Sequence, residues 1–267
     1  MTRLQTSHFN WPAWIGLAFV LFSVAIIGRL SLGFFDRSVD LLEMPIGTMV
    51  TVYLITAVGF TILAPLLVLR QAVSDQRTLL LLILVVGIVL RLAFFGAPTL
   101  LEDDYNRYLW DGAVTANGMN PYTYSPEQVA GFADKDHPLH KLSIEAGTIF
   151  QNINYPQFST VYPPVTQAVF AITYWIAPFS LDALRFILLF FELCCLGLIL
   201  AILMQLGKSP LWVVLYWWNP VVIKEIANSA HMEPILMLPV LGAVYLALQG
   251  RIMVPTVLLA VAAGVKI

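Results

Sequence analysis

The chain has 267 residues, of which 59% are hydrophobic and 11% are charged, and its net charge is −2. A soluble domain typically contains about 45–50% apolar and about 25% charged residues, so this composition excludes an ordinary soluble globular protein. The absence of an arginine-rich arm or a basic excess also argues against a nucleic-acid-binding surface. We therefore expect membrane lipids, and no nucleic acid, among the partners.

Several apolar segments have the length of membrane spans, because crossing about 30 Å of hydrocarbon takes about 20 residues. They cover residues 12–35, 46–69, 79–97, 162–179, 183–206, 210–226 and 233–249, with the start of another from 252. These seven or eight segments predict an all-α polytopic membrane protein that forms a single membrane domain over residues 1–267. The final residues still have the composition of a mid-helix segment, which predicts that the sequence is part of a longer protein.

A polar loop over residues 98–160 interrupts the apolar segments. The basic connection that holds Arg70 and Arg77 belongs in the cytoplasm by the positive-inside rule, which places this loop on the extracytoplasmic side. It holds eight of the sixteen acidic residues. Beyond residue 180 the rule is violated if 162–179 and 183–206 both cross fully, so a re-entrant or short segment is one explanation. We predict that this loop lies outside the membrane and, being far longer than a plain connection, has a functional role.

A helix is expected near the start of this loop. Thr99 and Glu102 have the spacing of a capping box, and Gly118 is a typical stop, so the helix should run to about Asn117. Four polar residues at i, i+3, i+4 and i+7 then share one helical face. They are Asp104, Arg107, Tyr108 and Asp111.

Glu102, Asp103 and Asp104 form a run of three carboxylates beside the bilayer. One interpretation is structural: Glu102 caps the helix, Asp103 favours its positive end, and Asp104 pairs with Arg107. The other is catalytic, because mutual repulsion and desolvation raise a carboxyl pKa toward the range of a useful base. For Glu102 the two interpretations are balanced, whereas for Asp103 and Asp104 catalysis is favoured.

A second polar group interrupts the apolar sequence between residues 218 and 233, and ionisable side chains at such positions are functional candidates. His231 and Glu233 are spaced i, i+2, which does not place both on one helical face, so we expect them to line a substrate pocket rather than to bind zinc. Lys224 and Glu225 have the alternative of snorkelling to the interface. Arg91, in an outer half-span, either snorkels or binds a lipid phosphate.

The run from Leu101 to Gly112, followed by Gly118-Met119-Asn120-Pro121-Tyr122 and then Tyr162-Pro163-Pro164, resembles the GT-C glycosyltransferases. The order and spacing are most similar to those of polyprenyl-phosphate-mannose-dependent mannosyltransferases. The resemblance covers residues 98–168 well. Relatives often have Asp-x-Asp where this chain has Glu-Asp-Asp, so the choice of base between Asp103 and Asp104 stays open.

The resemblance implies a GT-C-like helical bundle and transfer of a sugar, with mannose the leading choice, from a polyprenyl-phosphate donor to a lipid-linked or glycan acceptor. Asp104 or Asp103 would act as the base, Glu102 would tune it or hold a metal, and the anomeric centre would be inverted. Oxygen ligands of this kind favour magnesium or manganese, and whether the reaction uses a metal stays open. The residues expected to bind substrate, including the leaving phosphate, are Arg107, Asp111, Tyr122, Tyr162, Arg91, Lys141, His137, His231 and Glu233.

Two other functions fit a polytopic chain. In a transporter or lipid flippase, Arg91, Lys224, Glu225 and His231 would line a path and the loop would act as a lid, but no inverted repeat is visible. In a noncatalytic membrane assembly subunit, the loop would bind partner proteins.

Overall fold

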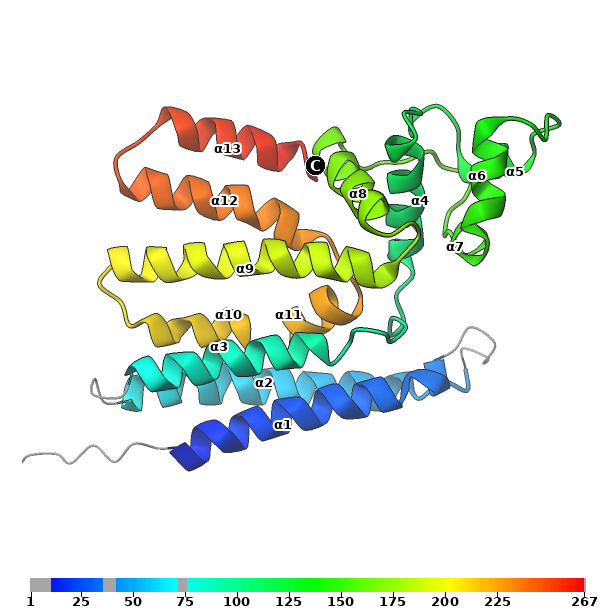
Figure 1. Ribbon diagram of the computed structural model, residues 1–267. Helices are drawn as coiled ribbons and strands as arrows, with labels where there is room; N and C mark the ends of the chain where they lie inside the picture. Colours follow the sequence, from blue (N-terminus) through cyan, green and yellow to red (C-terminus); the bar gives the residue numbers. More distant parts are fainter. Residues whose placement is uncertain (1–10, 36–41, 72–75, 267) are drawn as a thin grey trace, which may run out of the picture. The chain divides into compact units, whose positions relative to one another are not determined.

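The computed structural model describes residues 11–35, 42–71 and 76–266, and every regular element in these ranges is a helix (Figure 1). The all-α prediction is confirmed. The chain divides into two compact units, the first made of residues up to 100 and 199–228, the second of residues 101–198 and from 229 onward. The prediction of a single membrane domain over the whole chain stays a prediction.

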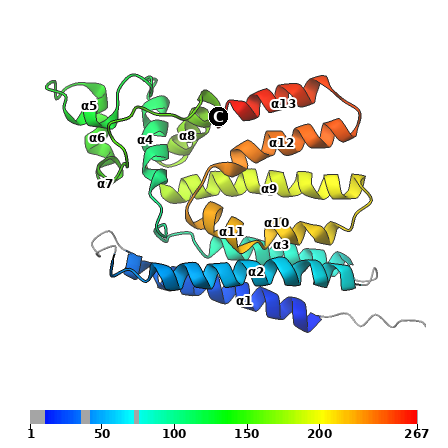
Figure 2. The same cartoon turned by 180° about the vertical axis from the view of Figure 1, so that it is seen from behind.

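The first unit contains three long helices, which lie side by side in both views (Figures 1 and 2). They are α1 (Trp11–Leu30), α2 (Ile46–Arg70) and α3 (Gln76–Leu92). A short 3-10 turn, η1 (Leu32–Phe35), follows α1. Much of the surface of α1 and α2 is apolar and exposed, as expected of helices that face lipid.

The predicted span over residues 210–226 is wrong as a continuous helix, because this segment is broken into short pieces. These are η3 (Pro210–Val213), α10 (Val214–Trp217), α11 (Pro220–Val222) and a π-helical turn, η4 (Ile223–Asn228). The break follows from Asn219-Pro220: the Asn219 side chain accepts hydrogen bonds from the amides of Val221 and Val222 and so starts a new helix.

Two adjacent indoles fix this broken segment to α3. Nε1 of Trp217 donates to the carbonyl of Leu84 at 3.0 Å, and Nε1 of Trp218 donates to that of Ile83 at 2.8 Å. Gly87 allows the close approach, since a Cβ there would lie 2.0 Å from Nε1 of Trp217. The first unit is therefore held together around two buried tryptophans.

The second unit contains α4 to α8, the first part of α9, and α12 and α13. Their bounds are α4 (Asp104–Ala116), α5 (Pro126–Ala130), α6 (Pro138–Ala146), α7 (Thr148–Gln151), α8 (Pro164–Ile176), α9 (Leu181–Gln205), α12 (Glu233–Leu248) and α13 (Met253–Ala263). Helices α12 and α13 pack side by side, and the end of α13 reaches α8 (Figure 2). There the amide of Val165 donates to the carbonyl of Gly264 at 3.1 Å.

Among the residues that the structure describes, three helices, α1, α2 and α9, are long and apolar enough to cross a membrane. Helix α8 has only 13 residues, about 20 Å at 1.5 Å per residue, which is shorter than the predicted full span over 162–179 and fits the alternative of a short segment. The continuous helices found within 162–179 and 210–226 are thus shorter than the predicted spans, and the number of membrane crossings stays a prediction.

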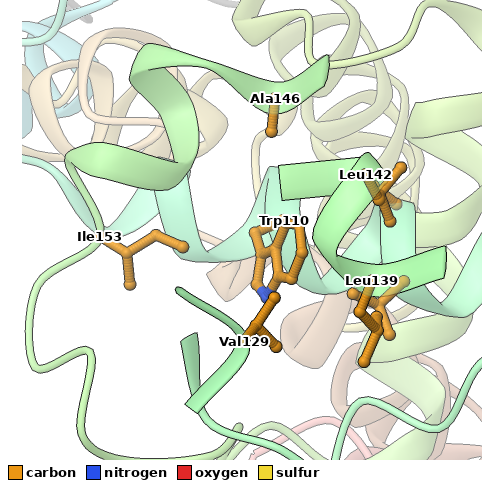
Figure 3. Packing of buried hydrophobic residues seen from close by; sticks show 8 residues of the cluster. Trp110, Val129, Leu139, Leu142, Ala146 and Ile153 are labelled. Atoms are coloured by element: carbon orange, nitrogen blue, oxygen red, sulfur yellow. The ribbon is translucent and has the colours of Figure 1, made fainter. Parts of the chain in front are cut away.

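The loop over residues 98–160 folds around α4, which is buried on nearly all sides. Trp110 of α4 lies at the centre of an apolar cluster drawn from α5, α6 and the segment after α7 (Figure 3). On the opposite side, the backbone of Phe170 in α8 approaches Gly112 so closely that a Cβ would lie 2.4 Å from the Phe170 carbonyl oxygen. These contacts fix α4, and with it the carboxylates at its start.

Candidate active site

The start of α4 differs from the prediction. The predicted capping box at Thr99 is wrong, because the helix begins at Asp104 with Asp103 in the N-cap position. The segment before it is tied elsewhere: the amide of Leu100 donates to the Asn228 side chain at 2.9 Å, and Leu101 has a left-handed backbone with φ of 55°. The predicted end is confirmed, since Asn117 is the C-cap and the chain turns after it.

Glu102 nonetheless serves the helix start. Its Oε1 accepts hydrogen bonds from the amide of Asp103 at 3.0 Å and from that of Asp104 at 3.2 Å. Amides in the first turn of a helix lack intrahelical partners, so a carboxylate there is stabilising. Glu102 therefore makes the contacts of a helix-capping residue. Its partners are the amides of Asp103 and Asp104, whereas the predicted capping box paired it with Thr99.

One side-chain amide lies between the two aspartates. Nδ2 of Asn154 donates to Oδ1 of Asp103 and lies 3.3 Å from Oδ1 of Asp104. The hydroxyl of Tyr108, one turn along α4, lies 3.5 Å from the other oxygen of Asp104. Asn154 is a residue that the sequence did not single out, because one amide in a polar loop has no spacing that distinguishes it.

The polar turn before α12 meets the same cluster. Nε2 of His231 lies 2.9 Å from Oε2 of Glu102, and its Nδ1 lies 3.9 Å from Glu233. Glu233 in turn pairs with Nζ of Lys266 at 2.9 Å. The structure therefore brings two predicted pocket residues, His231 and Glu233, next to the predicted carboxylates within one compact unit.

The electrostatics separate the carboxyl groups. The pKa of Glu102 is lowered to about 2, although the group is partly buried. The His231 imidazole is the main cause, and the backbone amides of Asp103 and Asp104 lower the pKa further. Burial, and then the negative charge of Glu102, raise the pKa of Asp104 above its usual value. Neighbouring carboxyls whose environments push their pKa values apart are typical of sites in which one group is the proton acceptor and the other a fixed charge.

Three of these side chains could hold a divalent cation. Glu102, Asp104 and His231 each present one ligand atom, and the three atoms lie within 4.8 Å of one another. An imidazole nitrogen beside carboxylate oxygens suits manganese or zinc better than magnesium, which prefers oxygen ligands and retains water. A three-ligand set would leave coordination positions open for substrate.

A pocket of about 350 Å³ lies beside the start of α4. Its lining combines polar groups with aromatic rings, namely Asp104, Arg107, Asn154, Tyr155, Phe158 and Tyr162. The volume falls in the range of about 300–1,000 Å³ that is usual for small-molecule sites, and a few convergent polar groups among apolar ones are typical of such sites. A hydroxyl entering this pocket would meet the Asp104 carboxylate.

Arg107 is engaged by the wall of this pocket. Its guanidinium donates to the carbonyls of Asn154 at 3.3 Å, Tyr155 at 3.1 Å and Phe158 at 3.2 Å. The side chain is largely buried. Arg107, a predicted substrate-binding residue, therefore lines the pocket. Its guanidinium also donates to three backbone carbonyls of the pocket wall.

Asp111 lies one further turn along α4 and is fully buried. Burial raises its pKa to about 6, although hydrogen bonds from Thr160 and Gln167 and the charge of Arg107 act in the opposite direction. Nε2 of Gln167 lies 3.4 Å from the Asp111 carboxylate. These contacts join α4 to the start of α8.

Tyr122 and Tyr162 meet each other near the pocket. The hydroxyl of Tyr122 donates to the Tyr162 carbonyl at 2.7 Å, and the Tyr162 ring packs edge-on against Tyr108 with 5.1 Å between centroids. The Gly-x-x-Pro-Tyr turn is thereby fixed to the proline entry of α8.

The remaining predicted cations lie away from the carboxylate cluster or in the other unit. Lys141 makes an exposed ion pair with Asp136 at 2.9 Å. Nδ1 of His137 accepts the amide of Leu139 and caps α6. In the first unit, the Arg91 guanidinium lies 3.5 Å above the Trp217 ring and donates to the Trp217 carbonyl at 2.8 Å.

The family model for the alpha-(1->6)-mannopyranosyltransferase N-terminal domain matches residues 13–267. The chain belongs to this family. The predicted resemblance to GT-C mannosyltransferases is confirmed, and the protein is a membrane glycosyltransferase of a mannosyltransferase family. No curated protein and no solved structure matches the chain.

Proposed function

We propose that this mannosyltransferase moves a mannosyl residue from a polyprenyl-phosphate donor to a hydroxyl of a lipid-linked or glycan acceptor, with inversion. The reaction would take place on the extracytoplasmic side of a bacterial plasma membrane. The family supports the sugar, and its name suggests an α-(1→6) linkage. The donor follows from the resemblance of the Glu102–Asp104 region to polyprenyl-phosphate-dependent enzymes.

Asp104 is the base in this proposal, and its position carries the argument. It lines the 350 Å³ pocket, and its pKa is raised by burial and by the neighbouring charge of Glu102. A carboxylate with a raised pKa accepts a proton more readily, which general-base catalysis requires. Glu102, by contrast, has a pKa of about 2 and would remain an anion throughout.

The bond changes are few. The acceptor oxygen gives its proton to Asp104 and forms a bond to the anomeric carbon, while the bond from that carbon to the phosphate oxygen breaks. Polyprenyl phosphate leaves with the electron pair. Attack opposite the leaving group uses one carboxylate and inverts the anomeric centre, unlike the two-carboxylate route of retaining hydrolases.

The leaving phosphate needs positive charge. Of the predicted cations, His231 lies at the carboxylate cluster and Arg107 lines the pocket, so these two are the proposed phosphate contacts. Lys266, which pairs with Glu233 and whose charge acts to lower the pKa of Asp104, is a third cation of the same unit. Preorganised positive charge in a water-poor site is typically worth about 10²–10³-fold in rate.

The test is transfer in proteoliposomes with radiolabelled polyprenyl-phosphate mannose and a membrane glycolipid extract as acceptor. We expect Asp104→Asn to lower the rate about 10²–10⁴-fold, the usual contribution of a general base. Asp136→Asn, in the same loop but exposed, is the matched control and should keep full activity.

The proposal has three separate points of failure. Full transfer by both Asp103→Asn and Asp104→Asn would refute the assignment of the base. Transfer from a nucleotide-activated mannose instead of the lipid donor would refute the donor class. A product whose anomeric configuration, measured by NMR, equals that of the donor would refute inversion.

A further inference from the structure

Adjacent carboxylates repel each other, so Asp103 and Asp104 need a device that holds both in a fixed orientation. One side-chain nitrogen can donate to two carboxylates only if it carries at least two hydrogens, as in a primary amide, a guanidinium or an ammonium group. Here the side-chain amide of Asn154 is such a group, because its Nδ2 donates to Oδ1 of Asp103 and to Oδ1 of Asp104. One nitrogen thereby bridges the two acids.

The backbone that carries Asn154 is itself fixed to α4. Arg107 donates to the carbonyls of Asn154, Tyr155 and Phe158. Arginine presents its donors in a rigid planar fork, so three such bonds from a buried guanidinium define the course of the segment. Nδ2 of Asn106 adds a bond to the Asn152 carbonyl at 3.4 Å.

These contacts form a chain of interactions that begins and ends on α4. Asp104 and Arg107 stand on the same helix, Arg107 holds the segment, and the segment returns Asn154 to the Asp104 carboxylate. Tyr155 has a positive φ of 50°, a backbone conformation that is uncommon for a bulky residue and that needs support from its surroundings. The Arg107 hydrogen bond to the Tyr155 carbonyl supplies part of that support.

We propose that Asn154 is a positioning residue, whose amide holds the Asp103 and Asp104 carboxylates so that Asp104 faces the acceptor hydroxyl in the pocket. The inference rests on the proposed function, in which Asp104 is the base. Orientation matters because a displacement of about 1 Å in a reacting group can cost about 10²-fold in rate. Arg107 contributes indirectly by fixing the segment.

Three variants separate this role from simple space filling. Asn154→Asp keeps the shape but replaces the donor by a third carboxylate, Asn154→Ala removes the side chain, and Asn154→Gln keeps the amide on a longer stem. We expect kcat to fall about 10–100-fold for Asn154→Ala, further for Asn154→Asp, and least for Asn154→Gln. The KM for the polyprenyl-phosphate donor should change much less. Gln151→Ala, an exposed amide in the preceding helix, is the control.

The order of the variants decides the outcome. A space-filling role predicts that Asn154→Asp equals the wild type and that Asn154→Ala is the worst, and this order would overturn the inference. Unchanged kcat in Asn154→Ala would do the same. If Asn154→Ala fails to fold, judged by its melting temperature, the comparison of Asn154→Asp with Asn154→Gln retains the test.

Failure of the inference is distinguishable from failure of the proposed function. If Asp104→Asn is inactive while the Asn154 variants transfer at the wild-type rate, only the positioning role is refuted. If Asp104→Asn and Asp103→Asn both retain full transfer, the base itself has been wrongly assigned and the role of Asn154 is refuted with it.

Discussion

Nε2 of His231 lies 2.9 Å from Oε2 of Glu102, so the turn that precedes α12 is joined to the residues that precede α4. Both side chains are largely shielded, with exposed fractions of 25% and 20%. When the imidazole carries its second proton, an ion pair in such surroundings is screened less than a surface pair. This contact is also the main cause of the low pKa of Glu102.

A double-mutant cycle should therefore detect coupling between these two residues. We expect Glu102→Gln and His231→Ala to be non-additive in the free energy of unfolding, with a coupling energy on the order of 1 kcal/mol. The measurement is reversible unfolding in detergent for the two single variants and the double variant. The exposed pair Asp136–Lys141 is the matched control, and its coupling should be near zero. Equal coupling in the two pairs would contradict the expectation.

Asp111 should make stability depend on pH. Its folded pKa of about 6 lies above its usual value of 3.8, so the folded state retains the proton to higher pH than the unfolded state does. The stabilisation is complete below about pH 4 and is lost as the pH rises through about 6, by at most about 3 kcal/mol.

Asp111→Asn tests this dependence because the amide cannot titrate. Between pH 4.5 and pH 7.5 the melting temperature of the variant should fall less than that of the wild type. Glu127→Gln, an exposed residue of the same unit, should follow the wild type. Parallel curves for Asp111→Asn and the wild type would show that the buried carboxyl does not control this transition.

Gly87→Ala should destabilise the first unit. The added Cβ would lie 2.0 Å from Nε1 of Trp217, so the indole must move and lose its hydrogen bond to the Leu84 carbonyl. Overpacking of this kind costs about 1–3 kcal/mol. Gly197→Ala is the control, because nothing lies within 4 Å of its Cβ position in α9. A melting temperature for Gly87→Ala as high as that of Gly197→Ala would be evidence against this packing.

Arg107→Lys should loosen the wall of the pocket. An ammonium group cannot reproduce the planar fork that binds the carbonyls of Asn154, Tyr155 and Phe158. We expect faster amide hydrogen exchange over residues 152–158, including the Phe158 amide that donates to the Tyr155 carbonyl. Lys141→Ala, which removes only an exposed pair, should leave exchange in this segment unchanged. Unaltered protection in Arg107→Lys would argue that other contacts hold the segment.

The sequence by itself determined the helical membrane class, the run of three carboxylates and the end of their helix near Asn117. Hydropathy and composition reflect burial in lipid, and a glycine such as Gly118 ends a helix through local backbone geometry, so both are readable along the chain. The family resemblance also rests on local motifs, such as Gly118 to Tyr122. Hydropathy missed the break at Asn219-Pro220, because an average over apolar residues does not register a new helix cap.

Only the tertiary structure decided which side chains meet the carboxylates. Asn154 reaches Asp103 across 51 positions of the chain, and His231 reaches Glu102 from the turn before α12. Side-chain spacing predicts neighbours within a few turns of one helix, whereas these contacts depend on how Arg107 fixes the segment after α7 and how the second unit folds. The sequence supplied the acids, and the fold supplied the groups that orient them and separate their pKa values.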